Sequence, residues 1–497
     1  MSKISKKIMV VLALSLVFVM IFAGCSSTKQ DAVLGGNASA TVTGNGGLVV
    51  RQGDYVYYIN GLTAVGDIKE DADNTFGNVV KGAIMRGKID KNGAITDTKV
   101  LVPLMCLSSN KNGGINVFGN WVYYTTPSIQ KDKNEVMQTS YLEFMRTSLD
   151  GTKTENIATV DGNGLQYKFS PYSLIYFAAG KITRIPYSDS KIEKAEVVAE
   201  KVSSVILPQN ETYVPGKASV DDVIFYTKAA KDDEATYNET YSVGVKAGSK
   251  AELIIGGESY LGADKKADKK LQYQITLKDY NLVEGGIELY YEKANPNDAE
   301  NKAGIFGVLA KDGKIADIKA NEVRFTNKTQ ATFFKAGLDK GIYVFEGGKL
   351  TLMKESIDEN GISRFEVGKS LKFGGSETIV DFIDYKFAEE SVPSVLYMLN
   401  SKLYVRALDD DLKLNAKAIS EETYGINNSW LGVEIMDGRA YFFNSSYYNY
   451  LESMDIATGM MAKNDKDELT HPLANLNAAD KKTEQDRIDK EKEEANK

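Results

Sequence analysis

The chain is poor in histidine, cysteine, tryptophan and proline, and the first two shortages exclude whole classes of site. It has one histidine, His471, so zinc sites that need two histidines and histidine-rich metal centres cannot form within it. A Ser-His-Asp triad would have to use that same residue, which precedes Pro472 at the start of a charged tail. We therefore select no catalytic, metal-binding or cofactor-binding residue, and we expect no cofactor.

Only two cysteines are present, Cys25 and Cys106. If Cys25 carries a thioether-linked lipid, Cys106 has no partner within the chain and no disulfide stabilises the fold. The apolar neighbours Met105 and Leu107 favour a buried structural thiol at Cys106 over a nucleophile. The fold must then be stabilised by buried apolar area.

Residues 1–24 have the pattern of a secretory signal peptide. Lysines at positions 3, 6 and 7 precede an apolar run over residues 8–22, and the small residues Ala23 and Gly24 complete a cleavage site. The run has 15 residues, whereas about 20 are needed to cross the hydrocarbon core of a membrane. A retained transmembrane anchor is therefore the weaker interpretation.

The sequence Phe22-Ala23-Gly24-Cys25 resembles a lipobox, at which bacteria attach diacylglycerol to a cysteine and cut the chain before it. The resemblance implies that Cys25 is the lipidation site; the alternative is an ordinary signal peptide with a chance cysteine. Because two acyl chains hold a protein stably at a membrane, we predict a lipid-anchored protein on the extracytoplasmic face of the cell membrane. Residues 25–46, rich in small and polar side chains, are predicted to be a flexible tether.

The charge balance is acidic. The formal net charge is −8, and removing residues 1–24 takes away three lysines and no acids, which gives −11 for the mature chain. This argues against nucleic acid as a partner. Residues 466–497 form a charged C-terminal tail, which we predict to be an exposed helix or disordered; a docking peptide for another envelope protein is the more specific alternative.

Short aromatic segments recur along the chain and predict strands. Their central aromatic residues are 44 to 66 residues apart, close to the length of a propeller blade with loop insertions. The eight copies are Val56-Tyr57-Tyr58, Val122-Tyr123-Tyr124, Ile175-Tyr176-Phe177, Ile224-Phe225-Tyr226, Leu289-Tyr290-Tyr291, Ile342-Tyr343-Val344, Leu396-Tyr397-Met398 and Ala440-Tyr441-Phe442.

The flanks of these segments repeat as well. Turn-forming residues such as Asp54 and Asn120 precede the aromatic segments, and an apolar strand lies before each turn. A third strand follows, in which residues 85–90 align with residues 145–150, and a fourth apolar strand completes the unit. Four antiparallel strands make one blade.

These repeats resemble the Tyr-Trp-Thr-Asp propeller repeats of low-density lipoprotein receptor-like proteins. The chain is more similar to a family of uncharacterised bacterial surface lipoproteins with degenerate copies of that repeat. The resemblance covers residues 47 to about 465 and depends on the aromatic strand and the Met145-Arg146-Thr147-Ser148-Leu149-Asp150-Gly151 type of third strand. The Trp-Thr-Asp that follows the tyrosine in the receptors is absent, so the resemblance implies architecture and no ligand-binding residue.

We therefore predict an all-β protein with a β-propeller over residues 47–465. One twisted sheet cannot bury both faces alone, so neighbouring blades must stack and the ring must close. The eight aromatic segments predict eight four-stranded blades, with seven as the alternative. We expect a monomer.

The sequence leaves three functions open. The first is a noncatalytic binding or scaffold module for a protein, peptide or glycan, since blades present many loops for recognition. The second is a carbohydrate-active enzyme, because glycoside hydrolysis needs only two carboxyl groups about 5 to 10 Å apart and the chain has 68 acidic residues. The third is a factor that assists folding or assembly of envelope proteins.

Overall fold

The computed structural model describes residues 36–62, 81–89, 95–103, 105, 114–128, 130, 132–134, 136, 138, 140–230, 237–283, 286–295, 297, 303–311, 314–315, 318, 322–326, 332–334, 342–357, 363–387, 390–408, 416–419, 425–427, 432–461 and 476–495. Cys25, Cys106 and His471 lie outside these residues. Within these ranges, no helix combines the length and the apolar character needed to span a membrane.

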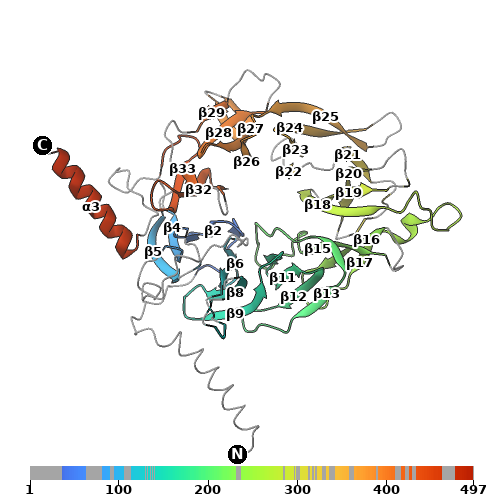
Figure 1. Ribbon diagram of the computed structural model, residues 1–497, viewed down its shortest axis with the longest axis horizontal. Coiled ribbons are helices and arrows are strands. Elements are labelled where there is room, and N and C mark those ends of the chain that lie inside the picture. The colour runs from blue at the N-terminus through green and yellow to red at the C-terminus, as the bar shows by residue number, and fades with distance from the viewer. Residues whose placement is uncertain are drawn as a thin grey trace, which may run out of the picture.

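Eight antiparallel sheets surround a common centre in a ring (Figure 1). The predicted eight-bladed β-propeller is confirmed, and the alternative of seven blades is excluded. The strands of blades 1 to 4 are β1 (Val42–Thr43), β2 (Val49–Gln52), β3 (Tyr55–Ile59), β4 (Ile84–Ile89) and β5 (Ile95–Val102); β6 (Asn116–Phe118), β7 (Trp121–Pro127), β8 (Tyr141–Ser148) and β9 (Thr154–Asp161); β10 (Gln166–Phe169), β11 (Ser173–Ala178), β12 (Lys181–Pro186) and β13 (Glu196–Ala199); and β14 (Val202–Ile206), β15 (Val223–Ala229), β16 (Asn238–Gly244) and β17 (Glu252–Ile255).

Blades 5 to 8 follow in the same order along the chain. Their strands are β18 (Gln274–Val283), β19 (Gly286–Ala294), β20 (Ala303–Ala310) and β21 (Val323–Thr326); β22 (Thr332–Phe334), β23 (Ile342–Glu346), β24 (Lys349–Ile357) and β25 (Ser363–Lys372); β26 (Thr378–Phe387), β27 (Glu390–Leu399), β28 (Lys402–Ala407) and β29 (Ala416–Ala418); and β30 (Ile426–Asn427), β31 (Glu434–Met436), β32 (Arg439–Asn444) and β33 (Tyr450–Asp455). In blade 8, β30 and β31 pair with the same edge of β32. The one-turn helix η3 (Gly257–Tyr260) follows β17, and α3 (Ala478–Ala495) follows the ring.

All eight aromatic segments lie on the same strand position of their blades. We call it the second strand, counting β1 as an added edge strand of blade 1 and β30 with β31 as one divided first strand of blade 8. The second strands are β3, β7, β11, β15, β19, β23, β27 and β32. In blades 1 and 2 a tight turn precedes the second strand, where Gly53 and Gly119 have φ angles of 61° and 58°, a conformation that favours glycine. The aromatic segments therefore predicted the position of each blade in the sequence correctly.

Blade 3 departs from the expected alignment by one residue. In the first three blades an arginine on the third strand pairs with the second strand, as Arg86 with Tyr57, Arg146 with Tyr123, and Arg184 with Ile175. The equivalent of Tyr57 and Tyr123 is therefore Ile175, whereas the sequence alignment assigned Tyr176. Because successive side chains of a strand point to opposite faces, Tyr176 lies on the other face and is only half-buried.

The hydrophobic core lies between blades. Among the described residues, seven clusters of buried apolar side chains each join neighbouring blades, and together they cover all eight interfaces. The largest joins blades 8, 1 and 2, with Tyr441, Tyr57 and Val117 among its members. A blade thus buries its two faces only when both neighbours are in place.

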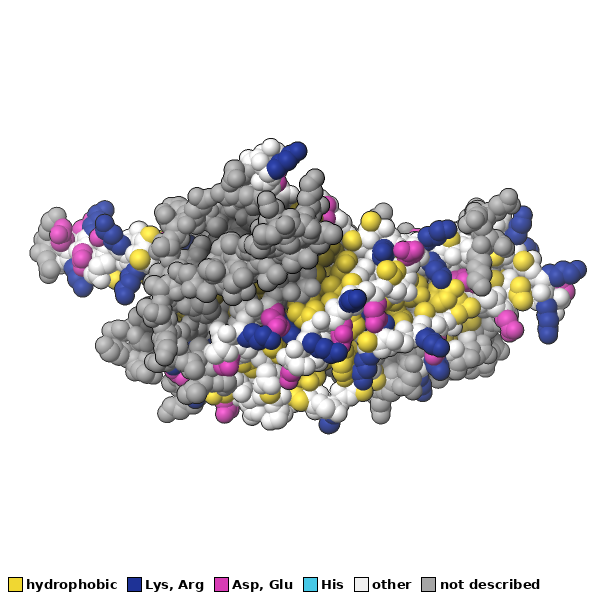
Figure 2. Space-filling view, turned by 90° about the horizontal axis from the view of Figure 1, so that it is seen from below, with side chains coloured by type: hydrophobic (Ala, Val, Ile, Leu, Met, Phe, Trp, Pro, Cys, Tyr) yellow, Lys and Arg dark blue, Asp and Glu magenta, His cyan; other side chains and the backbone are white. Residues whose placement is uncertain are grey.

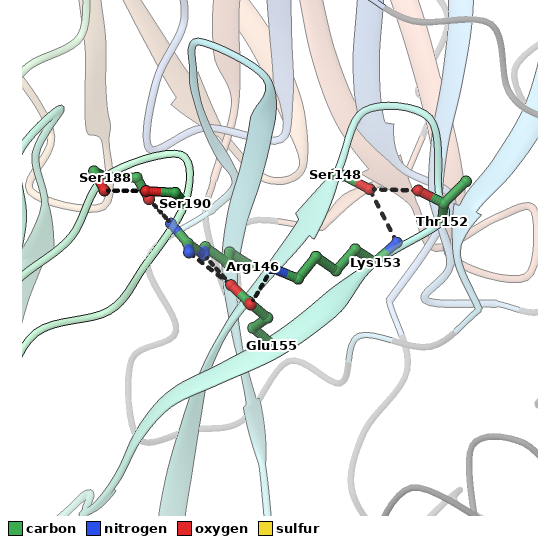
Figure 3. Close-up of polar contacts among 7 residues, drawn as sticks. All are labelled: Arg146, Ser148, Thr152, Lys153, Glu155, Ser188 and Ser190. Carbon is green, nitrogen blue, oxygen red and sulfur yellow. Dashed lines mark hydrogen bonds and ion pairs between the residues drawn. The ribbon is translucent and has the colours of Figure 1, made fainter.

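Buried arginines add polar contacts between blades. The Arg146 guanidinium donates to the Glu155 carboxylate on the same blade at 2.7 Å and to the backbone carbonyl of Ser188 on blade 3 at 2.7 Å (Figure 3). Arg184 repeats this arrangement one blade further, donating to the carbonyl of Gly244 at 2.7 Å. The arginine of the repeated third strand thus has a structural explanation in two blades, because it ties blade 2 to blade 3 and blade 3 to blade 4.

Among the strands that the structure describes, none is exchanged where the ring closes between blade 8 and blade 1. The Glu434 carboxylate on β31 accepts a hydrogen bond from the backbone N–H of Val49 on β2 at 2.8 Å. The N–H of Leu62 donates to the carbonyl of Asn449 at 2.9 Å. The seam between the two ends of the ring therefore depends on these contacts and on the shared apolar cluster.

Residues 36–46 belong to the segment predicted to be a tether, and they are bound to the ring. β1 pairs with β2, and Val42 exchanges two backbone hydrogen bonds with Tyr213 of blade 4. The Asn45 side chain bonds the N–H and the carbonyl of Val117 on blade 2, at 2.7 and 3.4 Å. The bound segment therefore begins before residue 47, because its backbone finds partners on three blades.

Helix α3 projects from the edge of the ring near β4 and β5 (Figure 1). None of its side chains is buried. The Tyr450 hydroxyl donates to Asp480 at 2.8 Å and accepts from the N–H of Asn477 at 3.0 Å, and Lys81 lies 3.2 Å from the same aspartate. The Tyr448 hydroxyl also donates to Glu484 at 3.3 Å, so the helix is attached to the ring at its first two turns.

Candidate functional site

A cavity of about 280 Å³ lies between blades 3, 4 and 5. Pro171 comes from the turn between β10 and β11, and Leu282 from the end of β18. The remaining wall is formed by residues 209–214, 217–219 and 221–222, from the long loop between β14 and β15. All three segments connect the first strand of a blade to the second, so the cavity lies on the face of the ring that carries these turns.

Asp221 holds the loop in place. Its carboxylate accepts hydrogen bonds from the backbone N–H of Asn210 at 2.6 Å, from that of Gln209 at 3.2 Å, and from the Tyr280 hydroxyl of blade 5. Tyr280 in turn accepts a bond from the N–H of Gln209 at 2.6 Å. Asp221 is 2% exposed, so we assign it to positioning the loop against blade 5.

Contacts with blades 1 and 2 also hold the loop. Tyr213 pairs with Val42 of the N-terminal segment, and its ring meets Phe118 of blade 2 edge-on at 5.4 Å. The loop therefore contacts blades 1, 2 and 5 although it belongs to blade 4. This network fixes the shape of the cavity wall.

Three buried polar atoms around the cavity have no hydrogen-bond partner among the described residues. They are Oε1 of Gln209, Nδ2 of Asn210 and Oδ1 of Asp222. Asn210 is only 3% exposed, and all three residues line the cavity. These atoms are sealed from solvent, and leaving each of them without a partner costs about 1 to 3 kcal/mol.

Both neighbouring aspartates have raised pKa values. Burial raises the pKa of Asp222, and the adjacent Asp221 raises it further, while the bond from the Ser219 N–H and the charge of Lys246 lower it. Burial also raises the pKa of Asp221, against the lowering effect of its Tyr280 and backbone hydrogen bonds. Oδ1 of Asp222 has no hydrogen-bond partner, but it is sealed from solvent.

An apolar rim accompanies these polar groups. Leu282 lines the cavity with 45% of its surface exposed, and its neighbour Val283 is 37% exposed. Val220, next to Asp221 in the loop, is 48% exposed. Of these three residues, only Leu282 lines the cavity, whose other lining residues are mostly polar.

A second cavity, of about 100 Å³, has polar groups that are already paired. Lys293 donates to Glu322 at 2.6 Å, and the Tyr260 hydroxyl donates to the carbonyl of Asn238 at 2.7 Å. It offers a ligand fewer unsatisfied groups than the first cavity. No cluster of three or more metal-ligating side chains occurs in the part of the chain that the structure describes.

The side of the ring in Figure 2 carries mixed charge. Lysines, arginines and acidic side chains alternate there, with hydrophobic side chains exposed between them. The described part of this side therefore has no extended surface of one sign.

Sequence reasoning did not identify the cavity. The one site residue that it selected, Cys25, lies outside the described residues, as do Cys106 and His471. A polar run at Gln209-Asn210 and an acidic pair at Asp221-Asp222, both between two predicted strands, were the available signals. Neither has a spacing that distinguishes it from an ordinary surface loop.

No known protein family matches the sequence, and no curated protein does either. Among solved structures, dipeptidyl peptidase 4 of Porphyromonas gingivalis is similar with a TM-score of 0.43 and 10% identity, over 88% of this chain and 61% of the peptidase chain. AztD of Citrobacter koseri is similar with a TM-score of 0.36 and 8% identity, over 77% and 91% of the two chains. A protein from Lactobacillus plantarum has a TM-score of 0.33 and 9% identity, over 82% and 94%. This chain thus spans about three fifths of the peptidase.

Proposed function

We propose that the protein is a noncatalytic binding module whose ligand, a protein segment, peptide or glycan, occupies the cavity between blades 3, 4 and 5. The cavity itself carries this proposal, because its wall combines polar side chains such as Gln209 and Glu211 with the exposed apolar side chain of Leu282. The loop that forms most of its wall is held by Val42, Phe118 and Tyr280 of other blades, so the site is organised before a ligand arrives. Preorganisation lowers the entropic cost of binding.

We further propose that this module is held on the extracytoplasmic face of the cell membrane by lipid on Cys25. The lipobox-like sequence before Cys25 and the apolar run over residues 8–22 support the anchor. In that location the binding face would meet molecules of the cell envelope.

The hydrogen bonds of the cavity favour binding over hydrolysis. A glycosidase of the usual kind needs two carboxyl groups that both reach the substrate. In this cavity Asp221 already accepts three hydrogen bonds within the protein and Oδ1 of Asp222 is sealed from solvent, so this adjacent pair does not present two free carboxyl groups to a substrate. Asp221 therefore acts on a ligand only through the loop that it holds.

Ligand-observed NMR on the purified mature protein tests the proposal. The library should contain monosaccharides, short peptides, amines and carboxylates, and the variants Gln209→Met and Asn210→Asp each change one unpartnered atom. Asp384→Asn, an exposed residue on β26 of blade 7, is the matched control. Saturation transfer to a compound that both cavity variants weaken and the control preserves is the expected result.

Absence of binding across the library would overturn the proposal. Turnover of a bound polysaccharide, lost in Asp222→Asn, would replace it with the hydrolase. Thermal melting of each variant separates loss of binding from loss of the fold.

A further inference from the structure

We infer that residues 42–47 form a strap that loosens as the pH rises, and that the loosened strap releases one side of the loop in the cavity wall. The strap consists of β1 and the tight turn that follows it. The inference describes regulation of the cavity, so its consequence for a ligand rests on the proposed binding function. The movement itself is independent of any ligand.

The strap is an addition to a complete blade. Strands β2 to β5 already give blade 1 four antiparallel strands, and β1 is a fifth strand at the edge formed by β2. Val42 is the one large apolar residue in the sequence Val-Thr-Gly-Asn-Gly-Gly of the strap. Segments with few buried apolar contacts open at a lower free-energy cost than core strands. The strap can therefore open while the four strands of blade 1 stay paired.

Backbone hydrogen bonds join the strap to the cavity loop. The N–H of Val42 donates to the carbonyl of Tyr213 at 2.8 Å, and the N–H of Tyr213 donates to the carbonyl of Val42 at 2.9 Å. The N–H of Asn45 donates to the carbonyl of Glu211 at 3.1 Å. Tyr213 and Glu211 both line the cavity. Opening of the strap therefore removes these backbone bonds from one side of the cavity wall.

The other side of the loop has contacts that do not involve the strap. The Asp221 carboxylate bonds the N–H of Asn210 and the hydroxyl of Tyr280 on blade 5. The edge-on contact between Tyr213 and Phe118 is also independent of the strap. Opening of the strap should therefore loosen the part of the loop around Tyr213 and leave the part around Asp221 in place.

The turn of the strap covers the Glu434 carboxylate. The N–H of Gly47 donates to the carbonyl of Gly44 at 3.1 Å, and a Cβ atom added at either glycine would lie within 2.8 Å of a carboxylate oxygen. Oε1 of Glu434 is sealed from solvent and has no hydrogen-bond partner among the described residues. A buried carboxylate oxygen without such bonds disfavours the ionised form. Opening of the strap admits water to this oxygen, while the other oxygen keeps the bond from the N–H of Val49.

The surroundings of Glu434 favour its protonated form under the closed strap. Burial raises the pKa of Glu434 to about 8, and the negative charge of Glu211 adds to this effect, against the lowering effect of two backbone hydrogen bonds. The strap has no titratable side chain, and Tyr441, the partner of Glu434 on β32, stays neutral because burial raises its pKa to about 12. The cations on the surrounding strands have contacts of their own: Arg51 with Asp437, Arg439 with Ser453, and Lys168 beside Gly46. Ionisation of Glu434 therefore favours the open strap.

Hydrogen exchange at pH 5 and pH 8, followed by mass spectrometry on the purified mature protein and on Glu434→Gln, measures the opening of the strap. Dividing the native rate by the variant rate at the same pH cancels the intrinsic pH dependence of exchange. Ionisation makes opening easier as the pH rises from 4.5 to about 8, so this ratio for residues 42–47 should be about tenfold higher or more at pH 8 than at pH 5. Residues 211–214 should show the same trend, and β15 should show none.

Val42→Pro cuts the strap from the loop and leaves the carboxylate at the seam unchanged. Proline has no N–H for the carbonyl of Tyr213, so exchange in residues 211–214 should be about fivefold faster or more at pH 5. Thr41→Ala, at an exposed position beside β1, is the matched control and should leave the exchange of the loop unchanged.

Asn45→Ala replaces this variant if Val42→Pro melts early, because it removes the two side-chain bonds to Val117 that hold the strap on blade 2. A native-to-variant ratio in the strap that is equal at pH 5 and pH 8 would refute the pH dependence. Faster exchange in the strap with unchanged exchange in residues 211–214 would refute its link to the cavity. A failed ligand search would instead overturn the proposed function, because the exchange measurements need no ligand.

Discussion

Replacing Glu434 with glutamine should remove a loss of stability that the native ring undergoes as the pH rises. Glu434 lies at the seam between blade 8 and blade 1, where it accepts the backbone N–H of Val49 at 2.8 Å. The residue is half-buried, but its second oxygen is sealed from solvent without a hydrogen-bond partner. Burial raises the pKa of this carboxyl group from 4.5 to about 8, with a smaller contribution from the charge of Glu211, and the backbone bonds from Val49 and Leu48 only partly offset it.

The direction of the effect follows from which state binds the proton. Between pH 4.5 and about 8 the folded protein keeps a proton on Glu434 that the unfolded chain releases, so rising pH favours unfolding. The stabilisation is complete below the unfolded pKa and is lost as the pH rises through the folded one. At 1.36 kcal/mol per pH unit the whole loss is at most roughly 5 kcal/mol.

Urea or thermal unfolding of the native protein and of Glu434→Gln, at pH 5, 7 and 9, measures this effect. Glutamine can accept the Val49 N–H and has no charge at any pH, so the variant should gain stability relative to the native protein as the pH rises. Other carboxyl groups with raised pKa values, such as Glu143 and Asp222, titrate in both proteins and cancel in the difference. Parallel pH profiles for the two proteins would refute the reasoning. Glu434→Ala, which leaves the N–H of Val49 without its acceptor, should be about 1 to 3 kcal/mol less stable than Glu434→Gln at every pH.

Three further predictions concern the blades, the helix and the N-terminus. Arg146→Met should lower the free energy of unfolding by about 3 kcal/mol in urea titrations, because it removes a buried ion pair and the donor to the Ser188 carbonyl. Tyr450→Phe should speed amide hydrogen exchange in α3 while leaving β32 unchanged, because the hydroxyl that bonds Asp480 is gone. Cys25→Ser should abolish incorporation of labelled palmitate and release the protein from the membrane fraction.

Each of these predictions has its own control. Arg487→Met, on the exposed face of α3, should change the free energy of unfolding by less than about 0.5 kcal/mol. Equal exchange rates in α3 with and without the Tyr450 hydroxyl would show that other contacts hold the helix. Palmitate labelling that persists in Cys25→Ser would locate the lipid elsewhere or exclude it.

The blade count could be predicted from the sequence because the signal is local. An aromatic second strand depends on its own residues and a repeated environment, and all eight aromatic segments lie on such strands. The register of blade 3 could not be predicted, since Ile175-Tyr176-Phe177 fits either face by composition and only its pairing with Arg184 decides between them. A shift of one residue exchanges the two faces of a strand.

The candidate site could not be predicted because it depends on contacts far apart in the sequence. Asn210 and Asp222 become a cavity wall only when Tyr280 of blade 5 and Val42 near the N-terminus hold the loop between them. In the sequence the same residues read as a polar connection between two strands. The inter-blade role of Arg146 was hidden in the same way, although its repetition was visible.

The absence of a shared strand at the seam makes the order of the blades independent of where the chain starts. Each sheet is built from consecutive residues, so every blade keeps its two neighbours if the polypeptide is cut in one inter-blade connection and its ends are joined by a linker at blades 8 and 1. A circular permutant that begins at blade 5 would have the same interfaces as the native protein. In this permutant a covalent linker would join blade 8 to blade 1. In the native protein the hydrogen bond from Val49 to Glu434 and the surrounding apolar cluster help to hold these two blades together.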